Sequence, residues 1–174
     1  MLHEQNIPIT PKAFSMGVRI EHPQTLIDQA QYGPSASHPR LGPSDYRLVH
    51  HCPNGRAAYT FCMCPGGRVI GASSEPDGIV VNGMSLYARN GPNANSALLV
   101  GVNPADFGSS SPFSGVSFQR QWEQKAFEMG GGDYFAPVQR VEDFLSGRPS
   151  VAMGQVNPSY LPGTTPGDLT GCLP

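Results

Sequence analysis

The sequence predicts an α+β fold, in which an antiparallel β-meander or small barrel-like sheet is accompanied by a few helices. Three observations lead to this prediction: short apolar runs between residues 46 and 102, turn residues that separate these runs, and two helical patterns after residue 115. Gly and Pro number 21 and 18 of the 174 residues, so turns are frequent, but 39% of the residues are hydrophobic and can form a core. The length fits one domain of ordinary size.

The chain is predicted to begin with a strand and a short helix. Apolar and small or polar residues alternate over residues 13–20, which is the period of a half-buried strand. Pro23 suits a first helical position and Gly33 suits a helix end, so residues 23–32 are predicted to form a helix. A loop with three prolines follows over residues 33–45.

The middle of the chain is predicted to be β-structure. Turn residues at 53–55, 65–67, 76–78 and 91–93 separate the apolar runs. Asn82-Gly83 is a strong signal for a tight hairpin turn. We therefore expect residues 1–115 to be mainly β with one short helix, and we expect strands over residues 46–51, 57–64, 68–72, 79–82, 84–88 and 96–102.

A pair of helices is expected over residues 116–147. Ser117 is a good helix cap, and the apolar residues Phe118, Trp122, Ala126 and Met129 follow at helical spacing before three glycines. A second helix is predicted to start at Pro137 and to end before Gly147, with an apolar face of Val138, Val141, Phe144 and Leu145. Residues 148–174 contain five prolines and are expected to form an irregular segment that leads to a further portion of the protein.

Composition excludes several classes of function. A net charge of −2 and a pI near 6.2 give no basic surface for nucleic acid or for an anionic membrane. Residues 1–8 do not resemble a signal peptide, and no run is long and apolar enough for a membrane span. Four cysteines, two of them one residue apart, do not suit a secreted disulfide framework, so a cytoplasmic location is expected.

The pair Cys62 and Cys64 is the most unusual chemical feature of the sequence. In a regular strand both thiols would lie on one face, just before the Pro65-Gly66-Gly67 turn. They could be small buried hydrophobic residues, or the pair, or one member with a lowered pKa, could exchange electrons with a neighbouring cofactor or disulfide. We take Cys62 and Cys64 as the candidate catalytic residues.

A metal site is a third interpretation of these cysteines. It would add His50, His51 and Cys52, but C-x-C spacing is a poor match to structural zinc sites, so no metal ligands are assigned. Arg19 with His22 could present cationic groups to an anionic substrate, or could be solvated surface residues.

A glycine-rich phosphate cradle is missing from the sequence. Dinucleotide-binding proteins carry G-x-G-x-x-G between a strand and a helix. Gly66-Gly67 instead lies between two predicted strands, and Gly130-Gly131-Gly132 follows a helix. No cofactor-binding residue is therefore assigned.

The chain resembles the uncharacterised FAD-dependent dehydrogenases of bacteria, a group of NAD(P)/FAD-dependent oxidoreductases. It is similar to an internal or C-terminal-side portion of these proteins, their FAD-dependent protein C-terminal domain. The resemblance extends over nearly the whole chain. It rests on six ordered segments: K-A-F-S-M-G-V-R-I-E-H-P-Q (12–24), Y-T-F-C-M-C-P-G-G (59–67), V-N-G-M-S-L-Y-A-R (81–89), N-A-N-S-A-L-L-V (93–100), F-Q-R-Q-W-E-Q-K-A-F (118–127) and Y-F-A-P-V-Q-R-V-E-D-F-L (134–145).

This resemblance implies an insert or cap domain of a flavoprotein whose FAD-binding domain is in two parts. A Rossmann portion would precede Met1 and a further portion would follow Pro174, so FAD would be bound by the full-length parent. The chain would cover the isoalloxazine ring on the substrate side, would be inactive alone, and would have the remaining FAD-binding portion and an unidentified small-molecule substrate as partners. Cys62 and Cys64 would exchange electrons with the flavin or line the substrate pocket.

Two alternatives to an oxidoreductase fragment remain open at this point. The chain could be a non-catalytic binding or interaction module that keeps the fold without the cofactor. It could also be a zinc-stabilised domain.

Overall fold

The main sheet has four antiparallel strands. In the computed structural model of the chain, residues 3–174 are described. The strand order is β1 (Phe14–Pro23), β6 (Asn93–Val102), β3 (Ala57–Cys64) and β2 (Val49–His51). Strand β6 is central, because its ten residues pair with all of β1 on one side and with β3 on the other.

Two smaller sheets accompany the main sheet. One is the antiparallel hairpin of β4 (Gly67–Gly71) and β5 (Val81–Ser85), and the other is the parallel pair of β7 (Ala136–Val138) and β8 (Thr164–Pro166). The predicted α+β fold is confirmed. In the described part of the chain the main sheet is open rather than closed into a barrel, and β6 inserts between β1 and β3 instead of following the order of a simple meander.

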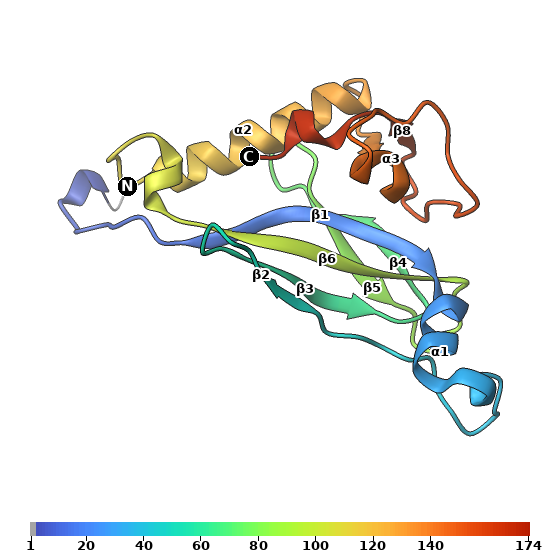
Figure 1. Cartoon of the computed structure of the whole chain (residues 1–174). Coiled ribbons are helices and arrows are strands. Elements are labelled where there is room, and N and C mark those ends of the chain that lie inside the picture. Colours follow the sequence, from blue (N-terminus) through green and yellow to red (C-terminus); the bar gives the residue numbers. More distant parts are fainter. Residues whose placement is uncertain (1–2) are drawn as a thin grey trace.

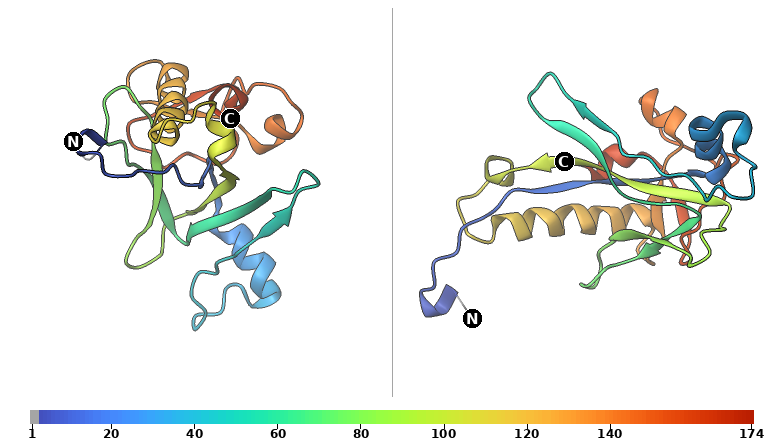
Figure 2. Two further views of the ribbon diagram at one scale, coloured as in Figure 1. Left: turned by 90° about the vertical axis from the view of Figure 1, so that its left-hand side faces the viewer. Right: turned by 90° about the horizontal axis from the view of Figure 1, so that it is seen from below.

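The helices lie on opposite sides of the β1–β6 pair. Helix α2 (Ser114–Gly130) runs along one side of the main sheet, and α3 (Val141–Leu145) and β8 lie beside its C-terminal end (Figure 1). Helix α1 (Gln24–Tyr32) and the β2–β3 hairpin lie on the other side (Figure 2). Short 3-10 turns complete the structure over His3–Gln5, Gly33–Ser35, Pro104–Phe107 and Leu169–Cys172. None of the helices among residues 3–174 has the length and apolar character needed to cross a membrane.

The two helices with the clearest sequence signals form where they were predicted. Helix α1 begins one residue after Pro23 and ends before Gly33, which has a φ of 54°. Helix α2 starts three residues earlier than predicted and is closed by Gly131, whose left-handed φ of 113° favours glycine. The predicted apolar face of α2 is confirmed at Phe118, which packs between Phe107 and Trp122 with ring centroids 5.4 and 6.0 Å away.

The hydrophobic core is small and lies between the β4–β5 hairpin and α2. Its buried members are Val69, Ile79, Ala136 and Tyr160, and Val81, Ala126 and Phe127 pack against them. Tyr160 comes from the C-terminal segment and donates its hydroxyl to the Tyr134 carbonyl oxygen at 3.1 Å. The segment predicted as irregular therefore contributes both a core residue and strand β8.

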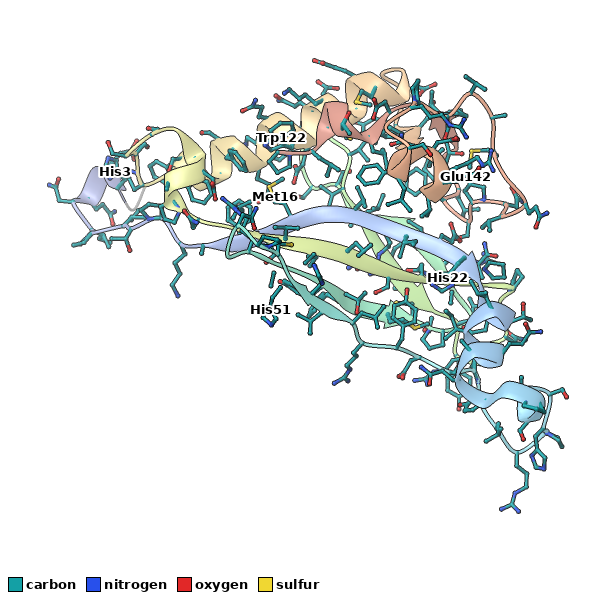
Figure 3. The ribbon with its side chains drawn as sticks, in the orientation of Figure 1. His3, Met16, His22, His51, Trp122 and Glu142 are labelled. Carbon is teal, nitrogen blue, oxygen red and sulfur yellow. The ribbon has the colours of Figure 1, made fainter. Side chains whose placement is uncertain are left out.

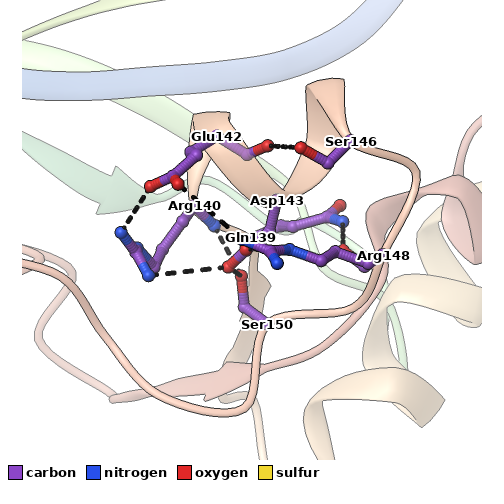
Figure 4. Close-up of polar contacts among 7 residues, drawn as sticks. All are labelled: Gln139, Arg140, Glu142, Asp143, Ser146, Arg148 and Ser150. Atoms are coloured by element: carbon purple, nitrogen blue, oxygen red, sulfur yellow. Dashed lines mark hydrogen bonds and ion pairs between the residues drawn. The ribbon is translucent and has the colours of Figure 1, made fainter.

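The prediction of a helix from Pro137 is wrong. Residues 136–138 form β7, and α3 is a five-residue helix whose expected apolar face is exposed, with Leu145 80% exposed. Polar contacts hold this helix instead: the buried Asp143 carboxylate accepts from Arg148 Nε and from Ser150 Oγ, each at 2.7 Å (Figure 4). The apolar spacing gave a wrong prediction because the backbone at Pro137 is extended by parallel pairing with β8. The paired residues Ala136 and Thr164 are 28 positions apart in the chain.

The predicted hairpin turn at Asn82-Gly83 is also wrong. These residues lie inside one continuous strand, β5, rather than between two strands. Gly83 faces the main sheet at very close range, since a Cβ built on it would collide with Asn95 Oδ1 and with the Arg19 guanidinium. Glycine is needed there for close approach, not for a turn.

We predict that Gly83→Ala destabilises the protein by about 1–3 kcal/mol, the usual cost of forcing extra atoms into a packed site. The added methyl group must displace Arg19 or Asn95. Urea unfolding followed by circular dichroism measures the change.

Gly101→Ala is the matched control for this substitution. Gly101 lies in β6, and a Cβ there would meet no heavy atom of residues 3–174 within 4 Å, so its free energy of unfolding is expected to change little. Equal effects of the two substitutions would refute the proposed close approach.

Candidate functional site

Strand β3 contains a β-bulge at the two candidate cysteines. Phe61 pairs with Ala97 and Cys64 pairs with Asn95, so three residue steps on β3 match two on β6. Cys62 carries a φ of 47°, a conformation that residues other than glycine rarely adopt. The bulge ends the regular pairing of β3 just before the Pro65-Gly66-Gly67 turn.

The Arg19 side chain fixes the bulge from β1. Its two terminal nitrogens both donate to the Cys62 carbonyl oxygen, at 3.3 and 3.2 Å, and Nη1 also donates to Asn95 Oδ1 at 2.8 Å. Asn95 has no exposed surface, and its Nδ2 has no hydrogen-bond partner among residues 3–174. Arg19 therefore does not point toward solvent, as the surface interpretation of the sequence assumed, but holds the backbone of β3.

The bulge separates the environments of the two thiols. Cys62 is exposed whereas Cys64 is 5% exposed, so the expectation that both lie on one strand face is wrong. Cys64 Sγ lies 3.3 Å from the Cys62 carbonyl oxygen, to which it donates. Burial and the neighbouring Cys62 raise the pKa of the Cys64 thiol above its ordinary value, against an opposing effect of Arg19. The surroundings of Cys64 therefore do not favour a lowered thiol pKa, and the catalytic role of the pair stays a prediction.

Helix α1 anchors the turn that follows the cysteines. The Gly66 amide donates to Gln24 Oε1 at 2.9 Å, and Gln24 Nε2 in turn donates to Asp28 Oδ1 at 2.8 Å. Asp28 also accepts from the backbone and the hydroxyl of Ser44, both at 2.8 Å. Burial alone would raise the pKa of Asp28, but these hydrogen bonds outweigh it and hold the pKa below the ordinary value. Sequence reasoning missed this network, because Gln24 and Ser44 form no recognisable motif.

A groove lies beside the bulge, between α1 and the main sheet. Its volume is about 310 Å³ and its walls come from β1, β3, β6, α1 and the segment before β2. His22, which Figure 3 places at the end of β1 next to α1, is one wall residue, and its Nε2 lies 2.8 Å from the Tyr46 hydroxyl. The sequence singled out His22 but not Tyr46, which was expected only as the start of a strand and instead precedes β2.

The residues of the zinc hypothesis do not assemble into a site. His50 and His51 lie in β2 and are exposed, and Cys52 follows them. Within residues 3–174, no group of three or more His, Cys, Asp or Glu residues is arranged to hold a metal ion. The zinc-stabilised alternative therefore has no ligand set in the described part of the chain.

Comparison with known proteins identifies the family. The model of the family described as "FAD-dependent protein, C-terminal domain-like" matches residues 13–174. The chain belongs to this family. The resemblance inferred from the six ordered segments is confirmed.

An uncharacterised protein from Clostridium beijerinckii is similar to this member of the FAD-dependent protein C-terminal family along its whole length. The two are 51% identical over 175 residues, which cover 100% of this chain but 33% of the relative. The chain thus spans about a third of the length of that protein.

The family name implies FAD, but the described residues do not fit its pyrophosphate. Such a group needs free amides at a helix start. The Gln24 amide at the start of α1 already donates to the Pro92 carbonyl oxygen at 2.9 Å, and a Cβ on Gly115 in the first turn of α2 would meet the rings of Phe14 and Phe107. The Gly66 turn is equally closed, because a Cβ there would collide with the Arg89 carbonyl group.

We predict that iodoacetamide at pH 8 alkylates Cys62 at least about ten times faster than Cys64, because thiolate content and exposure control the rate. Cys62 is exposed, whereas Cys64 is buried and has a raised pKa. Timed labelling followed by tandem mass spectrometry separates the two positions. Equal rates would contradict the bulged geometry.

We also predict that Asp28→Asn destabilises the protein near neutral pH and that this effect shrinks as the pH falls. The folded pKa of Asp28 lies below its unfolded value, so its stabilisation is present above the unfolded pKa and is lost as the pH falls through the folded one. The difference in free energy of unfolding should stay constant down to about pH 4 and shrink below it as the pH falls toward the folded pKa. Urea titrations from pH 7 to pH 3 measure the difference, and a constant difference would refute the Asp28 network.

Proposed function

We propose that this chain is the substrate-side domain of an FAD-dependent oxidoreductase, with the dehydrogenase activity belonging to a longer parent protein. The family match over residues 13–174 carries the proposal. The misfit of the pyrophosphate to the described residues and the greater length of the Clostridium beijerinckii relative support it. Polypeptide outside this chain then binds the cofactor phosphates, and FAD supplies the redox chemistry there.

The bulged end of β3 is the part of the chain that we assign to the flavin ring. Phe61 is 61% exposed and the next residue, Cys62, is also exposed, so an aromatic ring and a thiol are both accessible at this end of β3. Arg19 on β1 holds the Cys62 backbone in place by donating two hydrogen bonds to its carbonyl oxygen. In this proposal Cys62 lines the pocket that the flavin and substrate share. The buried Cys64 thiol positions Cys62 by donating to the Cys62 carbonyl oxygen.

The remaining portion of the parent is the proposed protein partner. Large apolar side chains stay exposed near the C-terminal end, with Val151 94% and Leu161 84% exposed. Apolar surface of this kind is usually covered by another chain or domain. All four cysteines are free thiols, which suits work in the reducing cytoplasm.

The proposal predicts that the full-length Clostridium beijerinckii relative is yellow as purified and that the isolated chain of 174 residues does not bind FAD. Visible absorbance spectra test the first point. Titration of micromolar FAD with the chain, followed by flavin fluorescence, tests the second.

A third measurement tests the substrate-side position of the domain. Iodide quenching of flavin fluorescence should increase when the segment equivalent to this chain is cut by limited proteolysis from the full-length relative, because the ring loses its cover. A colourless full-length protein would overturn the proposal and favour the non-catalytic binding module. Unchanged quenching after complete cleavage and removal of the segment would place the domain away from the ring.

A further inference from the structure

We propose that Cys62 and Cys64 form a peroxide-reactive thiol pair, in which the exposed Cys62 is oxidised first and the buried Cys64 then closes a disulfide with it. The oxidant is a hydroperoxide such as hydrogen peroxide, and the product is a reversible modification of the β3 bulge. The proposal goes beyond the proposed function and does not depend on it, because both thiols belong to this chain and no flavin takes part.

The backbone of β3 brings the two cysteines within reach of a disulfide. Residues two positions apart in a regular strand have Cα atoms about 6.4–6.8 Å apart, whereas disulfides join Cα atoms about 4.4–6.8 Å apart. A regular strand is therefore at the outer limit of this range. The bulge shortens β3 here, because the three steps from Phe61 to Cys64 pair with only the two steps from Ala97 to Asn95 on β6.

The Cys64 side chain is directed back toward Cys62. Its Sγ donates to the Cys62 carbonyl oxygen at 3.3 Å, so the buried sulfur lies beside the residue that it has to join. Besides burial, the charge of the Cys62 thiolate and a hydrogen bond between the two side chains raise the pKa of the Cys64 thiol. The two sulfur atoms are therefore neighbours, although their exposure differs.

This difference in exposure assigns a separate step to each thiol. Oxidation of a cysteine depends on thiolate content and on access, so the exposed Cys62 is the first target and Cys64, which is 5% exposed, is not. Burial and the charge of Cys62 raise the pKa of Cys64. Oxidation of Cys62 to a neutral sulfenic acid removes the effect of its charge, while Arg19 continues to lower this pKa. The first step therefore prepares Cys64 for the second.

The reaction consumes one peroxide molecule and two thiols. The Cys62 thiolate sulfur attacks one peroxide oxygen, the O–O bond breaks, and the departing hydroxide takes up the thiol proton to become water. The Cys64 thiolate then attacks the sulfur of the sulfenic acid, the S–O bond breaks, and a second hydroxide leaves and takes up the Cys64 proton. Two electrons pass from the thiols to the peroxide, and the products are one disulfide and two water molecules.

The disulfide changes the chemistry of the bulge and leaves its support in place. It removes the exposed nucleophile Cys62 and the hydrogen bond from Cys64 Sγ, whereas the two hydrogen bonds from Arg19 to the Cys62 carbonyl oxygen can persist. A ring closed across a single intervening residue is strained, and strained disulfides are reduced readily by thiols. The modification is therefore reversible.

Mass spectrometry of the 174-residue chain tests the pair directly. One tryptic peptide, residues 57–68, contains both members of the pair and no other cysteine. After brief exposure to hydrogen peroxide and blocking of free thiols with N-ethylmaleimide, we expect most of this peptide to carry no maleimide and to be lighter than the reduced peptide by two hydrogen atoms. Treatment with dithiothreitol before blocking should restore two maleimide labels.

Three variants separate the roles of the two thiols. Cys64→Ser should leave Cys62 as a sulfenic acid that dimedone labels, because no neighbouring thiol reacts with it. Cys62→Ser should give at least about ten times less dimedone label, at Cys64, because the buried thiol is not reached. Cys172→Ser is the matched control, since it removes a half-buried thiol outside the bulge and should not change the yield of the disulfide.

Two results would overturn the proposal. Two maleimide labels on the peroxide-treated peptide, in a chain that circular dichroism shows to be folded, would show that the two thiols do not join. Disulfide-linked dimers on a non-reducing gel, in place of the internal disulfide, would show that Cys62 reacts without Cys64.

Discussion

The hydrogen bonds of the Arg19 guanidinium are the interaction on which the other features of the site depend. This one side chain from β1 bonds to Asn95 on β6 and to the Cys62 carbonyl oxygen on β3, and it also lies against Gly83 on β5. The backbone conformation of Cys62 costs about 1–3 kcal/mol, and the hydrogen bonds from Arg19 offset part of this cost. The main sheet, the β4–β5 hairpin and the cysteine bulge therefore all contact the Arg19 side chain.

The interior around this side chain is polar, whereas much apolar surface is exposed. Asn95 and Ser96 on the central strand have no exposed surface, while Leu48 and Leu98 beside the groove remain partly in solvent. Proteins usually show the reverse distribution. Hydrogen bonds therefore close the site around Arg19, while these apolar side chains stay in contact with solvent.

The success of each sequence prediction depended on how local its cause is. Helices α1 and α2 were predicted within three residues, because helix periodicity and end residues such as Gly33 and Gly131 act within a few positions of the element that they define. The strand at Asn82-Gly83 was missed, because glycine serves there to admit Arg19 and Asn95 rather than to turn the chain. The groove partner of His22 could not be identified either, since Tyr46 reaches it across 24 positions of the chain.

The sequence by itself determined the α+β class, the two longer helices, the family and the absence of a glycine-rich phosphate motif, since each of these is written in composition, spacing or ordered segments. Only the tertiary structure decided the separate environments of Cys62 and Cys64. Strand alternation places both thiols on one face, and the alternation is broken by a bulge whose carbonyl group is held by a side chain 43 positions away. Local patterns contain no information on such a contact, because it forms only when β1, β3 and β6 have paired.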